Sequence, residues 1–400
     1  MKICYIVDSS EEKKMGLFYA VHNRIKKFQE HNHNIEVYSI RKYHSSLLRF
    51  IRTLFKVEVK KRGKKEFVYD SIVYHNIWYC ETLISYILEK LSYPDLFYLL
   101  YVKGFVKNRK KDSPDLIIAH WGLECGLFAM QLSKLLNKPF AVCYHGSDIH
   151  SSPLCWKKTL KRVMKQASAN IFVSRYLLGI ARTFYQINNS YIVCNGFDPT
   201  IFYQRTLEEK KQIRENLKIS GKIVAFYGNL EIVKRADLLP FIFSEIIKKV
   251  ENVSFWIVGD GSLRKQIEIE CNDNLLNVTF WGRVSAMKVA ELMNVSDVLI
   301  LPSKKEGYPL VLLEALACGT VCVSNSVGGI PEILSDSYLV DDQKLNWKEL
   351  FVQKVCDVLY GRVNVVESKT FNTWEDVYQQ EYVLFNKIIR NEDLNCYSCL

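Results

Sequence analysis

The sequence predicts an α/β fold with two domains, each built around a parallel sheet. Its 400 residues are more than one ordinary hydrophobic core accommodates. Short apolar runs, such as residues 2–7 and 298–301, alternate with segments of helical periodicity, which is typical of strand–helix repeats. In an open parallel sheet the carboxyl ends of the strands line the ligand site, so the residues that follow these runs are candidate functional residues.

The composition is that of a globular protein, because 48% of the residues are hydrophobic and 24% are charged. No apolar run approaches the roughly 18–20 residues that span a bilayer, and residues 1–8 are too short for a signal peptide. The twelve cysteines are therefore expected to be reduced thiols of a cytoplasmic protein. Cys396 and Cys399 form an isolated C-x-x-C pair, which is a weak metal signal, and no metal site is expected.

The first half is predicted to open with a buried strand and to continue, after Gly16, with a helix. The runs LIIAH and FAVCYH predict two further buried strands on either side of a helix, and both end in histidine. His120 and His145 would therefore lie at the ligand edge of the first sheet. Asp148 follows at once in the string HGSD.

Positive charge is concentrated in the first half, since residues 1–205 carry a formal charge of +16 and residues 206–400 one of −5. Residues 41–65 alone hold ten lysines and arginines. The apolar residues of this segment that recur at helical spacing are Leu47, Leu48, Ile51, Leu54 and Phe55. An amphipathic helix beside a polybasic run is typical of contact with an anionic membrane surface, where each basic residue contributes about 1 kcal/mol. A solvated surface helix would show the same charges. Nucleic acid is not an expected partner, because no nucleic-acid-binding motif accompanies the charge.

The second half is predicted to start its own sheet at the run KIVAFY and to continue it at VSFWIV. Gly228 follows the first run, and Gly259 and Gly261 follow the second, so all three would lie at the ligand edge. Trp374 opens a final amphipathic helix, whose apolar residues recur three to four positions apart.

The most informative stretch is residues 303–334, which hold two carboxylates, Glu306 and Glu314, with seven residues between them. The pattern predicts a loop, a helix, a short buried strand, a turn at Gly328 and Gly329, and a further helix. A glycine-flanked helix N-terminus at the carboxyl end of a strand is a ready anion site.

The strings EGYPL, EALACG and GGIPE occur in this order, and with them the stretch resembles the nucleotide-sugar site of the retaining GT-B glycosyltransferases of group 1 (family 4). The resemblance covers about residues 115–390. It implies two Rossmann-like domains that face across a cleft, with the C-terminal helix crossing back to the first domain. Residues 1–203, with the returning helix at 375–400, would bind the acceptor, and residues 204–374 would bind the nucleotide sugar.

The resemblance also implies roles for single residues. Glu306 would position the donor sugar, Glu314 the ribose, and Lys234 would neutralise the departing diphosphate. His145 would contact the donor sugar or the acceptor. The other residues expected to bind the donor are Gly228, Asn229, Arg235, Gly259, Gly261, Gly307, Tyr308, Pro309, Leu310, Gly328 and Gly329. Gly16 and Asp148 belong to loops expected near the acceptor, and the family requires no metal or other cofactor.

Two residues depart from the family pattern. Asn229 stands where arginine is usual, and Arg235 stands where glycine is usual. An amide donates a hydrogen bond without a charge, and a charged hydrogen bond is roughly twice as strong. This chain would therefore use a different phosphate clamp or have lost activity.

The implied reaction is a hexosyltransferase reaction of the EC 2.4 class. A sugar would pass, with retention, from a nucleotide sugar to a hydroxyl of a glycan or lipid-linked acceptor. Polysaccharide or glycolipid biosynthesis on the inner face of the cell membrane is the expected setting, with the protein cytoplasmic and peripheral. The alternatives are a sugar-nucleotide epimerase of related fold, a non-catalytic scaffold that binds membrane or partner, and a nucleic-acid binder with steeply salt-dependent affinity.

Overall fold

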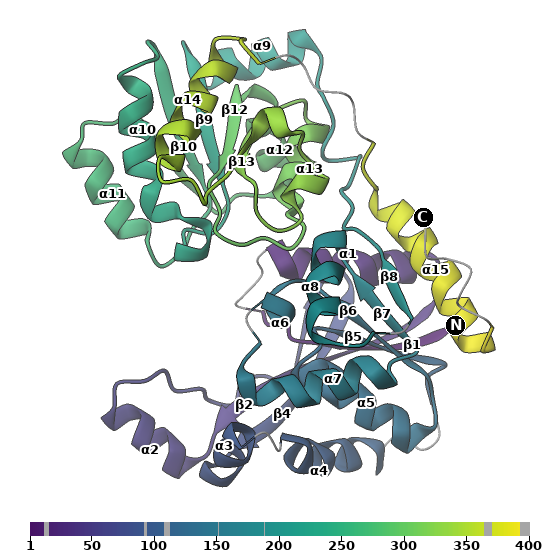
Figure 1. The fold of residues 1–400 in the computed structure, drawn as a ribbon. Coiled ribbons are helices and arrows are strands. Elements are labelled where there is room, and N and C mark those ends of the chain that lie inside the picture. Colours follow the sequence, from purple (N-terminus) through teal and green to yellow (C-terminus); the bar gives the residue numbers. More distant parts are fainter. Residues whose placement is uncertain are drawn as a thin grey trace. The chain divides into compact units, whose positions relative to one another are not determined.

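The computed structural model describes residues 1–11, 16–91, 94–107, 113–150, 152–187, 189–363 and 370–392. They form two compact units, the first of which comprises Met1–Cys194 and the C-terminal segment from Glu375. The second unit comprises Asn195–Trp374. Each unit has a sheet of its own, mostly or entirely parallel, with helices packed on it (Figure 1). The pair Cys396 and Cys399 lies outside the described residues.

The sheet of the first unit has eight strands in the order β3-β4-β2-β1-β5-β6-β7-β8. Neighbouring strands are parallel except for β3 and β4, which form an antiparallel pair. Because β1 lies between β2 and β5, the strand order reverses at β1, and open α/β sheets bind ligands at such a point. The strands are β1 (Lys2–Val7), β2 (Asn34–His44), β3 (Glu66–Tyr69), β4 (Ile72–Glu81), β5 (Leu116–His120), β6 (Phe140–Tyr144), β7 (Ala169–Phe172) and β8 (Ser190–Ile192).

The helices of the first unit include the returning C-terminal helix. The helices are α1 (Gly16–Glu30), α2 (Ser46–Leu54), α3 (Leu83–Lys90), α4 (Pro94–Lys107), α5 (Glu124–Leu136), α6 (Ser147–His150), α7 (Lys157–Gln166), α8 (Arg175–Phe184) and α15 (Trp374–Arg390). Arg24 of α1 forms a buried ion pair with Glu381 of α15, and the rings of Phe28 and Phe385 stack with 5.2 Å between their centroids. The predicted return of the C-terminal helix to the first domain is confirmed.

The sheet of the second unit has six parallel strands in the order β11-β10-β9-β12-β13-β14. Its first strand, β9, lies between β10 and β12, so the strand order reverses there. The strands are β9 (Lys222–Tyr227), β10 (Val253–Val258), β11 (Val278–Gly282), β12 (Val298–Leu301), β13 (Val321–Asn325) and β14 (Leu339–Val340). The helices are α9 (Leu207–Asn216), α10 (Leu239–Ile247), α11 (Arg264–Asp273), α12 (Ala286–Val295), α13 (Leu310–Ala317) and α14 (Trp347–Leu359).

The predicted helix after Gly329 is wrong. The chain forms only a three-residue 3₁₀ turn there, Ile330–Glu332, and Ser335 is already extended with φ −78° and ψ 159°. Ile330, Ile333 and Leu334 are buried in the core of the second unit, so this segment packs down toward β14 without forming a full helix. Within the described residues, no helix combines the length and the apolar character needed to cross a bilayer.

Candidate active site

Lys234 and Glu306 meet where the second sheet reverses its strand order. Lys234 follows β9 and Glu306 follows β12, two neighbouring strands whose carboxyl ends share one edge. The Nζ atom of Lys234 donates a hydrogen bond to Oε1 of Glu306 over 2.6 Å. The hydroxyl of Ser303 donates to the same oxygen, also over 2.6 Å. The carboxylate of Glu306 is thus nearly buried and held from two directions before any substrate binds.

The two glycines after β13 shape the loop that carries Glu306. Gly328 has φ +62°, and a Cβ atom there would lie 1.9 Å from the carbonyl oxygen of Glu306. The N–H of Gly329 donates to the carbonyl of Gly307 over 3.1 Å. Only glycine permits this close approach of the two loops, and the amide of Gly329 already has a protein acceptor.

The glycine-rich loop after β10 also approaches its neighbour, the loop after β9, more closely than a Cβ atom would permit. A Cβ atom on Gly259 would lie 1.9 Å from the carbonyl oxygen of Gly228, and one on Gly261 would lie 2.4 Å from that of Leu230. Asn229 lies between these contacts and is partly exposed. Its side-chain amide makes no hydrogen bond within the part of the chain that the structure describes.

Arg235 has the left-handed conformation, with φ +51° and ψ +38°. This explains in physical terms why glycine suits the position, because a residue without Cβ adopts that conformation without strain. The guanidinium donates to Oδ2 of Asp342 over 2.8 Å and lies 4.4 Å from the centre of the Trp347 ring. An ion pair and a cation–π contact therefore hold Arg235, while Lys234 beside it turns to Glu306.

Glu314 lies on α13, the helix that begins directly after the Glu306 loop. Pro309 is the N-cap residue of this helix and Leu310 its first residue, while the carbonyl of Tyr308 accepts a hydrogen bond from the Asn195 amide over 3.0 Å. Although Glu314 keeps some solvent exposure, the surrounding protein removes most of the water from its carboxyl group. That desolvation raises the pKa of Glu314 to about 7.

In the first unit, His145 and His120 lie side by side, as their positions at the carboxyl ends of two neighbouring strands predict. His120 Nδ1 and His145 Nε2 are 3.0 Å apart and share a hydrogen bond. Burial, with a smaller effect of the Arg24 charge, lowers the pKa of His145 to about 3. Burial lowers the pKa of His120 well below its usual value as well. Both rings are therefore neutral at physiological pH.

A thiol completes the group, since the nearest ligand atoms of His120, Cys143 and His145 lie within 4.8 Å of one another. Burial raises the pKa of the Cys143 thiol to about 12, which opposes the thiolate form that a metal ion would require. The group therefore suits three packed neutral side chains better than a metal centre.

Asp148 and Gly16, the two residues expected near the acceptor, differ in their surroundings. The carboxylate of Asp148 is buried and accepts hydrogen bonds from the backbone N–H groups of Gly122, His145 and Gly146. Burial outweighs these bonds and raises the pKa of Asp148 to about 6. Asp148 thus ties the loop after β5 to the loop that carries His145. Gly16 begins α1, and no atom of the described residues lies within 4 Å of a Cβ added there, so none of them demands glycine.

Sequence reasoning missed Ser303 and Trp121. Ser303 stood in the analysed stretch, but a serine three residues before a glutamate carries no recognisable signal. Trp121 follows β5 directly and has φ +78°, a conformation that a tryptophan rarely adopts. Its position at the strand exit was the one available signal.

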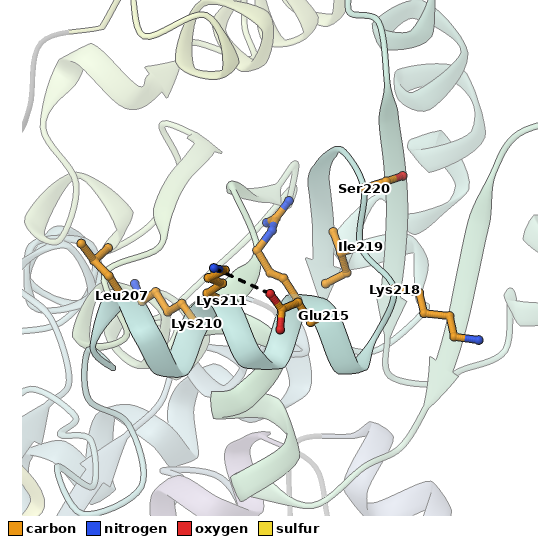
Figure 2. A pocket seen from close by; sticks show the side chains of 8 residues that line it. Leu207, Lys210, Lys211, Glu215, Lys218, Ile219 and Ser220 are labelled. Atoms are coloured by element: carbon orange, nitrogen blue, oxygen red, sulfur yellow. Dashed lines mark ion pairs between the residues drawn. The ribbon is translucent and has the colours of Figure 1, made fainter.

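A surface hollow of about 630 Å³ along α9 does not belong to the site (Figure 2). Figure 2 shows Lys211 paired with Glu215 across one turn of the helix, at 4.0 Å. The hollow reaches Ser220, which precedes β9, and so lies at the amino end of that strand. None of the predicted site residues lines it.

Two family models match the chain, one over each half. The model described as Glycosyltransferase Family 4 matches residues 21–201, and the one described as Glycosyl transferases group 1 matches residues 221–359. The chain belongs to the family 4, group 1 glycosyltransferases. These are GT-B enzymes of the EC 2.4 class that transfer a sugar from a nucleotide-sugar donor with retention of configuration.

Curated relatives within this glycosyltransferase family match at low identity but over most of the chain. The N-acetyl-alpha-D-glucosaminyl L-malate synthase of Bacillus anthracis is 27% identical over 274 residues, which are 66% of this chain and 69% of that protein. The putative teichuronic acid biosynthesis glycosyltransferase TuaC of Bacillus subtilis is 24% identical over 363 residues, 83% of each chain.

Solved structures agree with the GT-B fold of the glycosyltransferase. The sucrose-phosphate synthase of Thermosynechococcus elongatus matches with a TM-score of 0.70 at 16% identity, over 98% of this chain and all of that one. The Anabaena protein Alr3699/HepE, solved in complex with UDP-glucose, matches with a TM-score of 0.65 at 15% identity, over 97% of this chain and all of that one.

Proposed function

We propose that this glycosyltransferase transfers its sugar to a hydroxyl of a glycan or lipid-linked acceptor during assembly of a cell-surface polysaccharide or glycolipid. The second unit would bind the nucleotide sugar, and the first unit, with α15, would bind the acceptor. The observation that carries the donor half is the contact of Lys234 with Glu306 at the reversal point of the second sheet.

The donor roles follow from the chemistry of these groups. Glu306 accepts hydrogen bonds from hydroxyls of the sugar, and Glu314 accepts them from the ribose. As the bond to the anomeric carbon breaks, negative charge accumulates on the departing diphosphate. Lys234 supplies a positive charge to it, assisted by the amide of Asn229. The glycines of the surrounding loops, Gly228, Gly259, Gly261 and Gly328, hold the shape of the donor site, since the N–H groups of the first three already donate to protein acceptors. Preorganised charge of this kind is usually the largest single contribution to catalysis.

The loop residues that remain have positioning roles in this proposal. Glu306 is connected to the start of α13 by Gly307, Tyr308, Pro309 and Leu310. This short connection would bring Glu314 of α13 to the same edge of the sheet. Arg235 braces the Lys234 turn through Asp342 and Trp347. In the first unit, the neutral His145 ring contacts the donor sugar or the acceptor, and Asp148 fixes its loop.

The membrane contact is proposed for α2 and rests on its exposed apolar side chains. Leu47, Phe50 and Leu54 lie on one face of this helix and are 59%, 63% and 64% exposed. Leu48, by contrast, is buried, so the face that meets a lipid surface differs from the one expected from spacing alone. Arg49 and Arg52 lie on the same helix, which suits an anionic leaflet on the cytoplasmic side.

The test is transfer of label from a panel of nucleotide sugars, UDP-sugars first, into the lipid and polysaccharide fractions of membranes. We expect one donor to label one fraction, and nuclear magnetic resonance of the product to show the anomeric configuration of the donor. Labelling of neither fraction by any donor, with the protein folded, would contradict the proposed acceptor class.

A further inference from the structure

A cavity of about 870 Å³ opens at the carboxyl edge of the first sheet. Asp8 follows β1 and Trp121 follows β5, and both line the cavity, as do Arg41 and Lys42 near the end of β2. These three strands surround the point at which the first sheet reverses its order. The cavity therefore occupies the position where an open α/β sheet offers a ligand site.

One wall of the cavity is the basic segment Lys60–Lys64, and the protein holds this segment in place. The backbone N–H of Lys60 donates a hydrogen bond to the ring Nδ1 of His44 over 2.9 Å. The backbone N–H of His44 donates to the carbonyl of Lys60, also over 2.9 Å. The carbonyl of Lys64 accepts hydrogen bonds from the indole of Trp78 over 2.7 Å and from the amide of Asn76 over 3.1 Å. The segment is thus a fixed wall, not a loose polybasic tail.

The carboxylates that line the cavity do not neutralise all of its positive charges. Most carboxylates of the lining already have partners, since Asp8 pairs with Arg41, Glu11 with Lys64 and Glu124 with Lys42, at 2.9 to 3.3 Å. Glu89 accepts a hydrogen bond from the Trp156 indole.

Among the described residues, the cations of the cavity lining that have no carboxylate within ion-pair distance are Lys60, Lys61 and Arg62. The guanidinium carbon of Arg62 lies 5.9 Å from the centre of the Tyr43 ring. Of the carboxylates in the lining, Glu58 is the one not yet assigned a partner, so one negative charge faces three consecutive positive charges. An anionic ligand would find its partners there without displacing an existing ion pair.

Trp121 contributes an aromatic side chain to the lining. Its φ of +78° is fixed by hydrogen bonds from its N–H to Cys143 and from the N–H of Gly126 to its carbonyl, over 3.0 and 2.9 Å. A positive φ is unusual for a residue as bulky as tryptophan, so the surrounding hydrogen bonds determine this conformation. Its ring lies 5.4 Å from the His145 ring. An indole face in a polar cavity is a surface on which the C–H face of a sugar ring packs.

We propose that this cavity is the acceptor subsite and that it selects a saccharide carrying a negative charge. Lys60, Lys61 and Arg62 bind the anionic group, a phosphate or a uronic-acid carboxylate, while a sugar ring packs on Trp121. The acceptor role rests on the proposed function, since only a transferase has an acceptor. The polybasic run that suggested a membrane contact thereby acquires a second role, separate from the exposed face of α2.

The experiment measures the binding of three soluble probes to the full chain by isothermal titration calorimetry. Tetragalacturonate carries carboxylates, glucose 1-phosphate carries a phosphate, and maltotetraose is the neutral match for the first. We expect at least one anionic probe to bind at least tenfold more tightly than maltotetraose. Which of the two it is identifies the anionic group.

The triple variant Lys60→Ala/Lys61→Ala/Arg62→Ala should lose this preference, at least tenfold. Lys158→Ala/Lys161→Ala/Arg162→Ala removes the same charges from the exposed side of α7 and should retain it. Trp121→Gly tolerates the positive φ and should weaken binding of both tetrasaccharides. Equal binding of neutral and anionic probes, or equal losses in the two triple variants, would overturn the proposal.

Nucleotide binding, measured on the same preparations by thermal unfolding, separates the two proposals. A protein that binds a nucleotide sugar but shows no anionic preference keeps its proposed function and refutes the anionic acceptor. A protein that binds tetragalacturonate but no nucleotide sugar refutes the donor site and with it the acceptor role of the cavity.

Discussion

Lys234 and Glu306, 72 positions apart in the sequence, are joined by a hydrogen bond of 2.6 Å at the exits of two neighbouring strands. The pair places a cation and a carboxylate where the second sheet reverses its order. In the free protein each neutralises the other, and Ser303 orients the carboxylate. In the function we propose, a nucleotide sugar would offer Lys234 a second anion and Glu306 a set of hydroxyls, so the same contact would position both ends of the bond that breaks.

Replacing either partner should remove most of the activity. We expect Lys234→Ala and Glu306→Ala each to lower kcat by about 10²–10³, the usual cost of losing one preorganised electrostatic group. Transfer from the preferred donor measures this, and circular dichroism checks the fold. Full turnover in both folded variants would refute the assignment.

Glu314 should make nucleotide binding depend on pH. Its pKa of about 7 means that the carboxylate is mostly protonated at pH 6 and mostly ionised at pH 8. Because ribose hydroxyls donate to the ionised form, we expect affinity to rise about tenfold between pH 6 and pH 8.

The same raised pKa has the opposite effect on the unliganded fold. The stabilisation it gives is fully present below the unfolded pKa and is lost as the pH rises through about 7. Glu314→Gln should flatten both dependences, measured by calorimetry and urea unfolding. An unchanged pH slope of affinity in this variant would show that another group titrates.

Asn229 is the place to test the altered phosphate clamp. Its side chain makes no hydrogen bond to the described residues and is partly exposed, so a longer residue fits there without breaking a contact. Asn229→Arg should tighten binding of a nucleoside diphosphate about five- to tenfold, because a charged donor replaces a neutral one. Asn229→Lys restores the charge without the planar fork and should gain less. A loss of affinity in both variants would indicate that the diphosphate binds elsewhere.

The residues at the carboxyl edges of both sheets could be predicted from the sequence. The side chains that they contact from other parts of the chain could not. Apolar runs end where strands end, which placed His145 and Gly228 at strand exits, whereas the roles of Glu306 and Lys234 came from the family resemblance. The ion pair of Arg235 with Asp342 joins residues 107 positions apart, and no local pattern encodes such a contact. The sequence predicts a membrane contact or a solvated surface for the basic residues of 41–65. It could not show that Lys60–Lys64 form a fixed wall, because the fixation depends on Trp78 and Asn76 of a later strand.

The exposed face of α2 should govern membrane binding. Leu47→Ser/Phe50→Ser/Leu54→Ser should abolish sedimentation with vesicles that contain phosphatidylglycerol, because the apolar area that enters the lipid is lost. Leu207→Ser/Ile269→Ser/Leu275→Ser changes three exposed apolar residues of the second unit and should bind as the unchanged protein does. Equal sedimentation of both triple variants would exclude α2 as the contact.

The donor site is tested most directly by thermal unfolding in the presence of single nucleotide sugars, with Glu314→Ala as the comparison. A ligand that binds only the folded protein adds about 2.7 kcal/mol at a concentration one hundred times its Kd, which raises Tm by several degrees. The account predicts such a rise with one nucleotide sugar and its loss in Glu314→Ala. A rise of equal size in both proteins, or none with any nucleotide sugar, would contradict it.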